Sequence, residues 1–244
     1  SRDFRFGMNN DGDHTIYLIV GAIFLVLILF ITALINYSFS SAFMSEYVNC
    51  EGKVQSKNIW QKIKQNLGTV IVFIFIGIGI YIGYLIVSIL FAFIPLLGML
   101  VQYGLSFLVT AFFGLSFMSI FSGNKGLSEA LSEGWSFTFS SFGKVILFGL
   151  VIGILNLMIT MLIISIPGFI IGIYVYFSIE SHVDLLSSVF ANAVFTLGFA
   201  MFLLAFIYSQ ALTQIAYSVL YYNIFEEKNN VFLRSKIEQI GANE

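Results

Sequence analysis

The chain of 244 residues is too apolar for a soluble globular protein, because 59% of its residues are hydrophobic and only 10% are charged, where soluble domains carry about 25% charged residues. Its net charge of −2 gives no electrostatic reason to expect a nucleic-acid partner. The single cysteine, Cys50, excludes a disulfide framework, a cysteine zinc site and an iron–sulfur cluster. The composition predicts a polytopic membrane protein.

Long stretches without charge define the expected spans. The four longest lie between Asp13 and Glu46, Lys64 and Lys125, Lys144 and Glu180, and Asp184 and Glu226. Each exceeds the roughly 20 residues that a helix needs to cross the hydrocarbon core. Barrel strands are excluded because residues 16–35 are apolar on every face. With Pro95 dividing the second stretch, we predict an all-α transmembrane bundle of five spans, at residues 15–37, 67–93, 97–121, 145–166 and 201–222.

The positive charges predict the orientation of this bundle. All Lys and Arg residues except Arg2 and Arg5 fall within 53–64, 125–144 and 228–236. The positive-inside rule places these three segments in the cytoplasm, so the carboxyl terminus is expected to be cytoplasmic and Ser1 external. An external start without an initiator Met or a signal peptide favours a missing upstream span, and hence six helices in the full protein. Removal of a signal peptide before Ser1 is the alternative.

Two amphipathic segments, 56–66 and 126–137, are expected to form helices in the cytoplasmic membrane interface. Trp60 and Trp135 would anchor them at headgroup level, and the second would turn Leu127, Ala130 and Leu131 together with Trp135 to one face. Packing on the end of the bundle, with a purely structural role, is the alternative.

The same two segments align at a constant offset of 75 residues. Trp60, Gly68, Val70, Ile71 and Phe73 match Trp135, Gly143, Val145, Ile146 and Phe148. The alignment suggests a parallel internal repeat, although apolar sequences also match by chance.

The end of the chain departs from this repeat. The apolar stretch 168–178 is too short to span, so 168–184 is expected to be an external interfacial or re-entrant segment. Tyr221 and Tyr222 suit the inner aromatic belt and place the last span at 201–222, with 185–208 as the alternative.

The predicted spans contain neutral polar residues but no ionisable acid, base or cation. We expect these polar groups to hydrogen-bond across helices, or alternatively to line a small-molecule cavity. They are Asn156, Thr160, Gln210, Thr213, Gln214 and Tyr217. Three small-xxx-small pairs are expected to let helices pack closely. These are Gly79 with Gly83, Gly149 with Gly153, and Gly168 with Gly172.

No set of residues predicts catalysis. His14 and His182 lie beside acids, but solvated loop residues are expected there rather than metal ligands. Glu129 and Glu133 are expected to form a solvated helix face. The sequence contains neither a nucleophile elbow nor a phosphate-binding loop. We therefore expect no enzyme activity, no cofactor and no metal.

A resemblance supports this interpretation. Leu127-Ser128-Glu129-Ala130-Leu131 with Trp135, followed by Phe142-Gly143-Lys144 before a span, resembles a pattern of bacterial multi-pass proteins that also end in a sequence like Tyr221-Tyr222-Asn223. That group includes the membrane domain of membrane-anchored glycerophosphodiester phosphodiesterases. The present chain has Gly134 where Ser is usual. Residues 223–241, and Ile59-Trp60 with Lys64-Gln65-Asn66-Leu67, resemble uncharacterised Bacteroidota membrane proteins more closely.

The resemblance implies a six-helix domain of a bacterial inner membrane and brings no catalytic residue. We expect a non-enzymatic scaffold or accessory subunit that packs against lipids and other membrane protein subunits. The alternative is a small-molecule or lipid transporter, in which Gln210, Thr213 and Gln214 face Asn156. That alternative predicts a cavity in the bundle, and a fully packed interior would exclude it.

Overall fold

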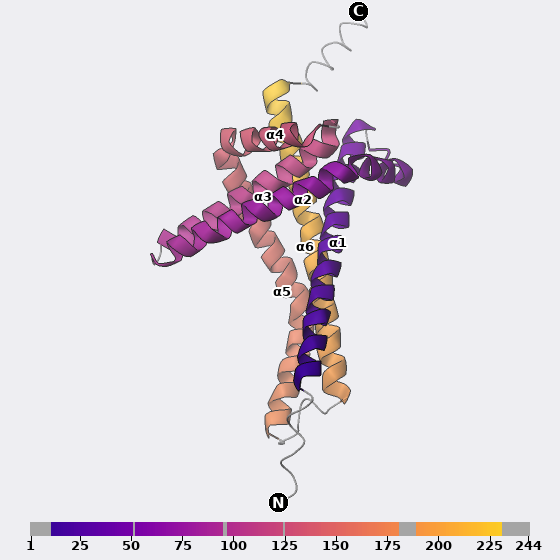
Figure 1. Cartoon of the computed structure of the whole chain (residues 1–244), viewed down its shortest axis with the longest axis vertical. Helices are drawn as coiled ribbons and strands as arrows, with labels where there is room; N and C mark the ends of the chain where they lie inside the picture. Colours follow the sequence, from indigo (N-terminus) through magenta and orange to yellow (C-terminus); the bar gives the residue numbers. More distant parts are fainter. Residues whose placement is uncertain (1–10, 51, 95–96, 124, 181–188, 231–244) are drawn as a thin grey trace, which may run out of the picture.

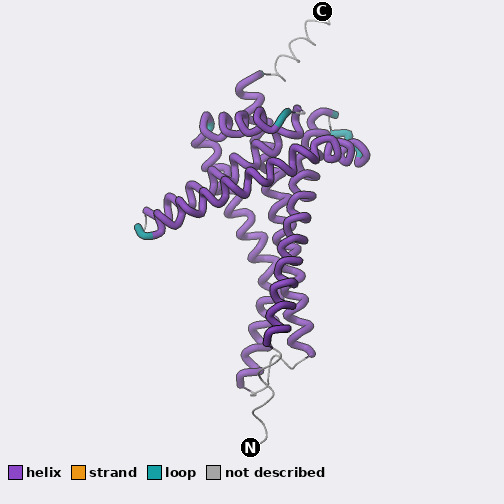
Figure 2. The backbone as a smooth tube through the Cα atoms, viewed as in Figure 1, coloured by secondary structure: helices purple, strands orange, loops and turns teal. Residues whose placement is uncertain are grey.

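The computed structural model describes residues 11–50, 52–94, 97–123, 125–180 and 189–230, and within these ranges all regular structure is helical (Figure 2). The helices are α1 (Asp11–Asn49), α2 (Ser56–Ala92), α3 (Leu97–Gly123), α4 (Leu127–Ser140), α5 (Phe142–Glu180) and α6 (Val189–Asn229). The all-α fold class expected from the sequence is confirmed.

Five of these helices, all except α4, are long and apolar enough to cross a membrane. The chain is therefore a multi-pass membrane protein. Helices α1 and α5 each contain 39 residues, which is about 58 Å of helix, whereas a hydrocarbon core is about 30 Å thick. The helices therefore extend well beyond the apolar stretches that predicted them.

This extension changes two of the expected segments and leaves the placement of a third open. The segment 56–66 is not a separate interfacial helix but the first part of α2, whereas 126–137 does form the separate helix α4. Residues 168–180 continue α5 past Pro167 instead of forming a new segment, and 181–184 lie outside the described residues. Proline removes one backbone hydrogen bond, a loss that membrane helices tolerate. Helix α6 spans 201–222 and most of the alternative span, so its membrane placement stays a prediction.

The two copies of the proposed repeat have different local structures. Trp60 lies inside the continuous helix α2, but Trp135 lies in α4, which a turn at Ser141 separates from α5. The two copies therefore differ in helix continuity.

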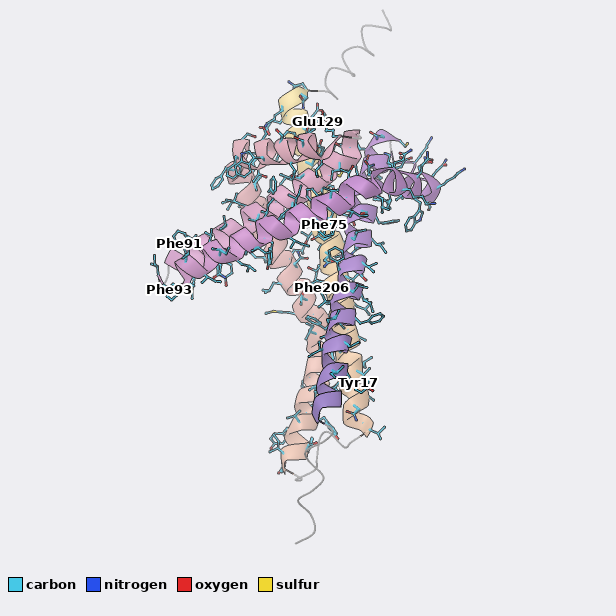
Figure 3. All side chains as sticks on the ribbon, viewed as in Figure 1. Tyr17, Phe75, Phe91, Phe93, Glu129 and Phe206 are labelled. Atoms are coloured by element: carbon cyan, nitrogen blue, oxygen red, sulfur yellow. The ribbon has the colours of Figure 1, made fainter. Side chains whose placement is uncertain are left out.

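The helices form a stalk with a projecting hairpin (Figure 1). In the stalk, α6 packs against both α1 and α5. The hairpin of α2 and α3 crosses the upper part of the stalk and projects to one side, ending near Phe91 and Phe93 (Figure 3). Helix α4 lies across the same upper end and packs on α3.

The buried side chains concentrate where the stalk, the hairpin and α4 meet, a region called the junction below. Its buried apolar residues are Ala42 of α1; Ile59, Ile63, Val70 and Phe73 of α2; Ala111, Leu115, Phe117, Met118, Ile120 and Phe121 of α3; Ala130 and Phe137 of α4; Val145 of α5; and Tyr217, Leu220, Tyr221 and Ile224 of α6. Aromatic rings in this core also pack edge to face, a favourable geometry. An example is the pair Phe73 and Phe117, whose ring centroids are 5.4 Å apart. The junction fixes the angle at which the hairpin leaves the stalk.

Candidate functional site

Gln214 is the central polar residue of the junction and is completely buried. Its Nε2 donates to Ser41 Oγ of α1 at 2.7 Å and to the Gly114 carbonyl oxygen of α3 at 3.3 Å. Because a carbonyl oxygen only accepts, the Gly114 contact fixes which end of the amide is the nitrogen. Its Oε1 is buried without a hydrogen-bond partner in the described part of the chain. Gln214 thus ties α6 to two other helices and leaves one acceptor unused.

Asn156 and Thr213 form a second interhelical contact, since Asn156 Nδ2 donates to Thr213 Oγ1 at 2.7 Å between α5 and α6. Thr160 and Gln210 are only partly buried. Tyr217 is buried, and its ring packs against that of Phe148 with the centroids 5.8 Å apart. The expected polar stripe is therefore divided between two separate contacts rather than joined in one cluster.

A crevice of about 540 Å³ opens beside Gln214 where the hairpin leaves the stalk. Its walls come from α1, α2, α3 and α6, and they are mostly apolar. Thr213, Gln214 and Tyr217 line it, whereas Asn156, Thr160 and Gln210 do not. No charged residue lines it. The interior is therefore not fully packed at this place, and the crevice has few polar groups in its walls.

Glu46 is the centre of a polar cluster that the sequence did not predict. Glu46 is only 4% exposed. Its carboxylate accepts hydrogen bonds from Asn58 Nδ2 at 2.6 Å and from Cys50 Sγ at 3.4 Å. Lys62 Nζ lies 3.1 Å from Glu46 Oε2 and also donates to Ser45 Oγ at 3.0 Å. The cluster joins the end of α1 to the beginning of α2 and compensates a buried charge.

The hydrogen bond to the Glu46 carboxylate also affects Cys50, an exposed residue just beyond α1. Together with desolvation, it raises the pKa of the Cys50 thiol above its ordinary value of 9.0. The thiol is consequently a weaker nucleophile at neutral pH than a free cysteine.

Glu133 forms a second cluster and corrects the expected solvated pair on α4. Glu129 is exposed, as Figure 3 shows, but Glu133 points inward. Its carboxylate accepts hydrogen bonds from Lys125 Nζ at 2.6 Å, from Tyr221 OH at 2.9 Å and from Ser119 Oγ. This cluster connects α4 to α3 and α6.

Of the expected aromatic anchors, some are exposed and others are buried, as with Glu129 and Glu133. Trp60 and Trp135 are 48% and 59% exposed, which leaves them accessible to an interface. Tyr221 is instead buried in the junction, with 1% of its surface exposed, and Tyr222 is partly buried. The Tyr221 hydroxyl bonds internally to Glu133 and to Ser122, the latter at 2.7 Å, so this side chain is not exposed as an anchor, and its depth in the membrane stays a prediction.

Close helix approach occurs mainly at glycines other than the expected ones. A Cβ atom added at Gly134 would lie 2.8 Å from the Ser116 backbone nitrogen, and one at Gly114 would lie 2.7 Å from the Tyr217 ring. Among the expected pairs, only Gly149 and Gly153 have a neighbour within 4 Å of an added Cβ, the Phe107 side chain, at 3.2 Å and 3.5 Å. In the described part of the chain, nothing lies within 4 Å of a Cβ added to any member of the other two pairs. These are Gly79 with Gly83, and Gly168 with Gly172.

The described residues contain no group of three or more His, Cys, Asp or Glu side chains that could hold a metal ion. The side chain of His14 and all of His182 lie outside the description. In comparisons with known proteins, no family model matches the chain, and neither a curated protein nor a solved structure matches it significantly.

Proposed function

We propose that the chain is a non-enzymatic integral membrane protein, a scaffold or accessory subunit whose projecting hairpin packs against a transmembrane helix of another membrane protein. The observation that carries this proposal is the α2–α3 hairpin, which leaves the stalk and has apolar sides uncovered by the described chain (Figure 3). Phe75 of α2, for example, is 69% exposed. Lipid covers such a surface adequately, but a projecting hairpin also presents it to a partner.

The Gly79–Gly83 pair supports a helical partner at this surface. Both glycines are exposed on α2, and nothing in the described chain lies near them. Small residues four positions apart let two helix backbones approach closely, which favours association where lipid provides no hydrophobic drive. We place the protein in a bacterial inner membrane with its carboxyl terminus in the cytoplasm, on the strength of the charge distribution and the resemblance to bacterial multi-pass proteins.

Purification from native membranes in a mild detergent, followed by mass spectrometry, tests this role. We expect a membrane protein partner in a fixed ratio, which Gly83→Leu removes by blocking close approach. Gly68→Leu is the matched control, because Gly68 also lies on α2 without a neighbour but far from the projecting end. A wild-type monomer with no stoichiometric partner would contradict the proposal.

The crevice favours a second candidate, a transporter of a small molecule or lipid. It opens between helices that belong to the two parts of the molecule, so a change in the angle of the hairpin would change its volume. Reconstitution of the wild type in liposomes tests this candidate. A transporter should move a labelled lipid between leaflets faster than it moves in vesicles without protein. Movement at the rate of protein-free vesicles contradicts it.

A further inference from the structure

We propose that the crevice binds one neutral, lipid-soluble molecule with a single long apolar chain and a terminal hydroxyl or amide N–H, which donates a hydrogen bond to Gln214 Oε1. This inference needs neither the accessory role nor transport. It rests on the size of the crevice, its walls and the unused acceptor beside it.

The size and walls suit an apolar chain. A volume of about 540 Å³ falls within the roughly 300–1,000 Å³ of small-molecule sites, which are mostly apolar with a few polar groups. Phe73 and Phe113 form part of the wall, with their rings edge to face and 5.8 Å apart. Ala33 and Gly77 also line the crevice, and their small side chains help to leave the space open.

The mouth of the crevice selects molecules that arrive through the bilayer. Tyr81 and Ile82 line it and are each 52% exposed. Both lie in the charge-free part of α2, inside a helix that is apolar enough to span a membrane. A water-soluble compound is poorly placed to enter there, whereas a lipid can move in laterally.

The polar groups set the charge and the hydrogen-bonding role of the ligand. With no Lys, Arg, His, Asp or Glu in the lining, an ionised headgroup would be buried without a counter-charge, which is costly. Thr110 Oγ1 already donates to the Ser106 carbonyl, and Thr213 Oγ1 accepts from Asn156. Gln214 also lines the crevice, and its Oε1 is buried without a hydrogen-bond partner in the described part of the chain; a buried unsatisfied acceptor favours a ligand that brings a donor.

Binding of two matched probes to the full chain in detergent tests the inference. Oleyl alcohol carries the hydroxyl donor, and oleyl methyl ether has the same chain without it. We expect the wild type to bind the alcohol about tenfold more tightly than the ether, because only the alcohol satisfies the buried acceptor. Equal affinity for the two probes would overturn the donor assignment, and this comparison needs no variant.

Two variants of α1 test whether the crevice is the site. Ala33→Phe fills the crevice and should abolish binding of both probes. Ala22→Phe adds the same ring on the same helix at an exposed position that does not line the crevice, and it should bind like the wild type. Undiminished binding to Ala33→Phe would show that the probe associates only with the outer surface. Retention of the membrane protein partner by Ala33→Phe would separate this result from the accessory role.

Gln214→Leu should abolish the preference for the alcohol while keeping affinity for the ether. Retention of the preference would assign the donor to another acceptor and overturn the role of Gln214. Lipid extracted from the purified wild type provides an independent readout. A neutral alcohol or amide enriched over its membrane abundance is expected, whereas phospholipids in bulk proportion would contradict the assigned class.

Discussion

The junction and the far part of the stalk use similar apolar side chains but bury them to very different degrees. Leu115 and Ile224 in the junction are fully buried, whereas Phe24 and Leu162 in the stalk are 63% and 69% exposed. Lipid tails are as apolar as these side chains, so exposure in the stalk does not carry the cost that it would in water. Close packing and buried polar contacts are therefore expected to determine stability in the junction, and much less so in the stalk.

The largest expected effect comes from Gly134→Ala in the junction. The new Cβ would meet the Ser116 backbone nitrogen at 2.8 Å and Ser116 Oγ at a still shorter distance. Backbone cannot move aside as a side chain does, so we expect destabilisation at or above the typical 1–3 kcal/mol of overpacking, about 3 kcal/mol. The midpoint of thermal unfolding in detergent measures it.

Gly143→Ala is the matched control for helix propensity, because Gly143 is exposed in α5 and no described residue lies within 4 Å of an added Cβ. Gly143→Ala should leave the stability unchanged or raise it slightly. Equal midpoints for the two variants would show that α4 does not pack tightly on α3. Gly134→Ser, which restores the residue of the resembling pattern, should behave like Gly134→Ala.

The second prediction tests the polar part of the junction. Glu133→Ala leaves Lys125, Tyr221 and Ser119 without their shared acceptor. We expect a loss of about 1–3 kcal/mol in the free energy of unfolding, because partly buried donors lose a charged partner. Glu129→Ala, one turn earlier and exposed, should change stability by less than about 0.5 kcal/mol. Comparable losses in both variants would place Glu133 on a solvated face after all.

The helices were predictable from the sequence because lipid imposes a simple rule, that a spanning helix must exclude charge over its apolar length. The helix ends were not, since charge-free stretches mark the apolar part of a helix and not its hydrogen-bonded length. For this reason α2 includes the segment expected to lie in the interface, and α5 continues through Pro167.

The interior of the junction was harder to predict than the helices. The expected apolar face of α4 was chosen from Leu127, Ala130, Leu131 and Trp135, whereas the face that is buried carries Ala130, Gly134, Phe137 and Thr138. Small residues one turn apart indicate a close approach, and this signal was present in the sequence. The bond between Tyr221 and Glu133 joins residues 88 positions apart, and no local pattern predicts a contact of that range.

In the stalk, the bond between Asn156 and Thr213 should contribute little. We expect a double-mutant cycle with Asn156→Leu and Thr213→Val to give a coupling of about 0.6 kcal/mol, the average for such bonds in membrane proteins. Asn156 Oδ1 is buried without a partner in the described chain, so Asn156→Leu alone should cost little. A coupling as large as the loss in Glu133→Ala would remove the contrast between stalk and junction.

The smallest effect concerns reactivity rather than stability, at Cys50 on the edge of the junction. Alkylation requires the thiolate, and the raised pKa of Cys50 reduces its thiolate fraction at pH 8. Iodoacetamide should therefore label the folded protein more slowly than the SDS-unfolded chain, although the side chain is exposed. Glu46→Gln removes the negative acceptor, lowers the thiol pKa and should increase the labelling rate of the folded protein. An unchanged rate in Glu46→Gln would show that Glu46 does not control the thiol, and would confine its role to Asn58 and Lys62.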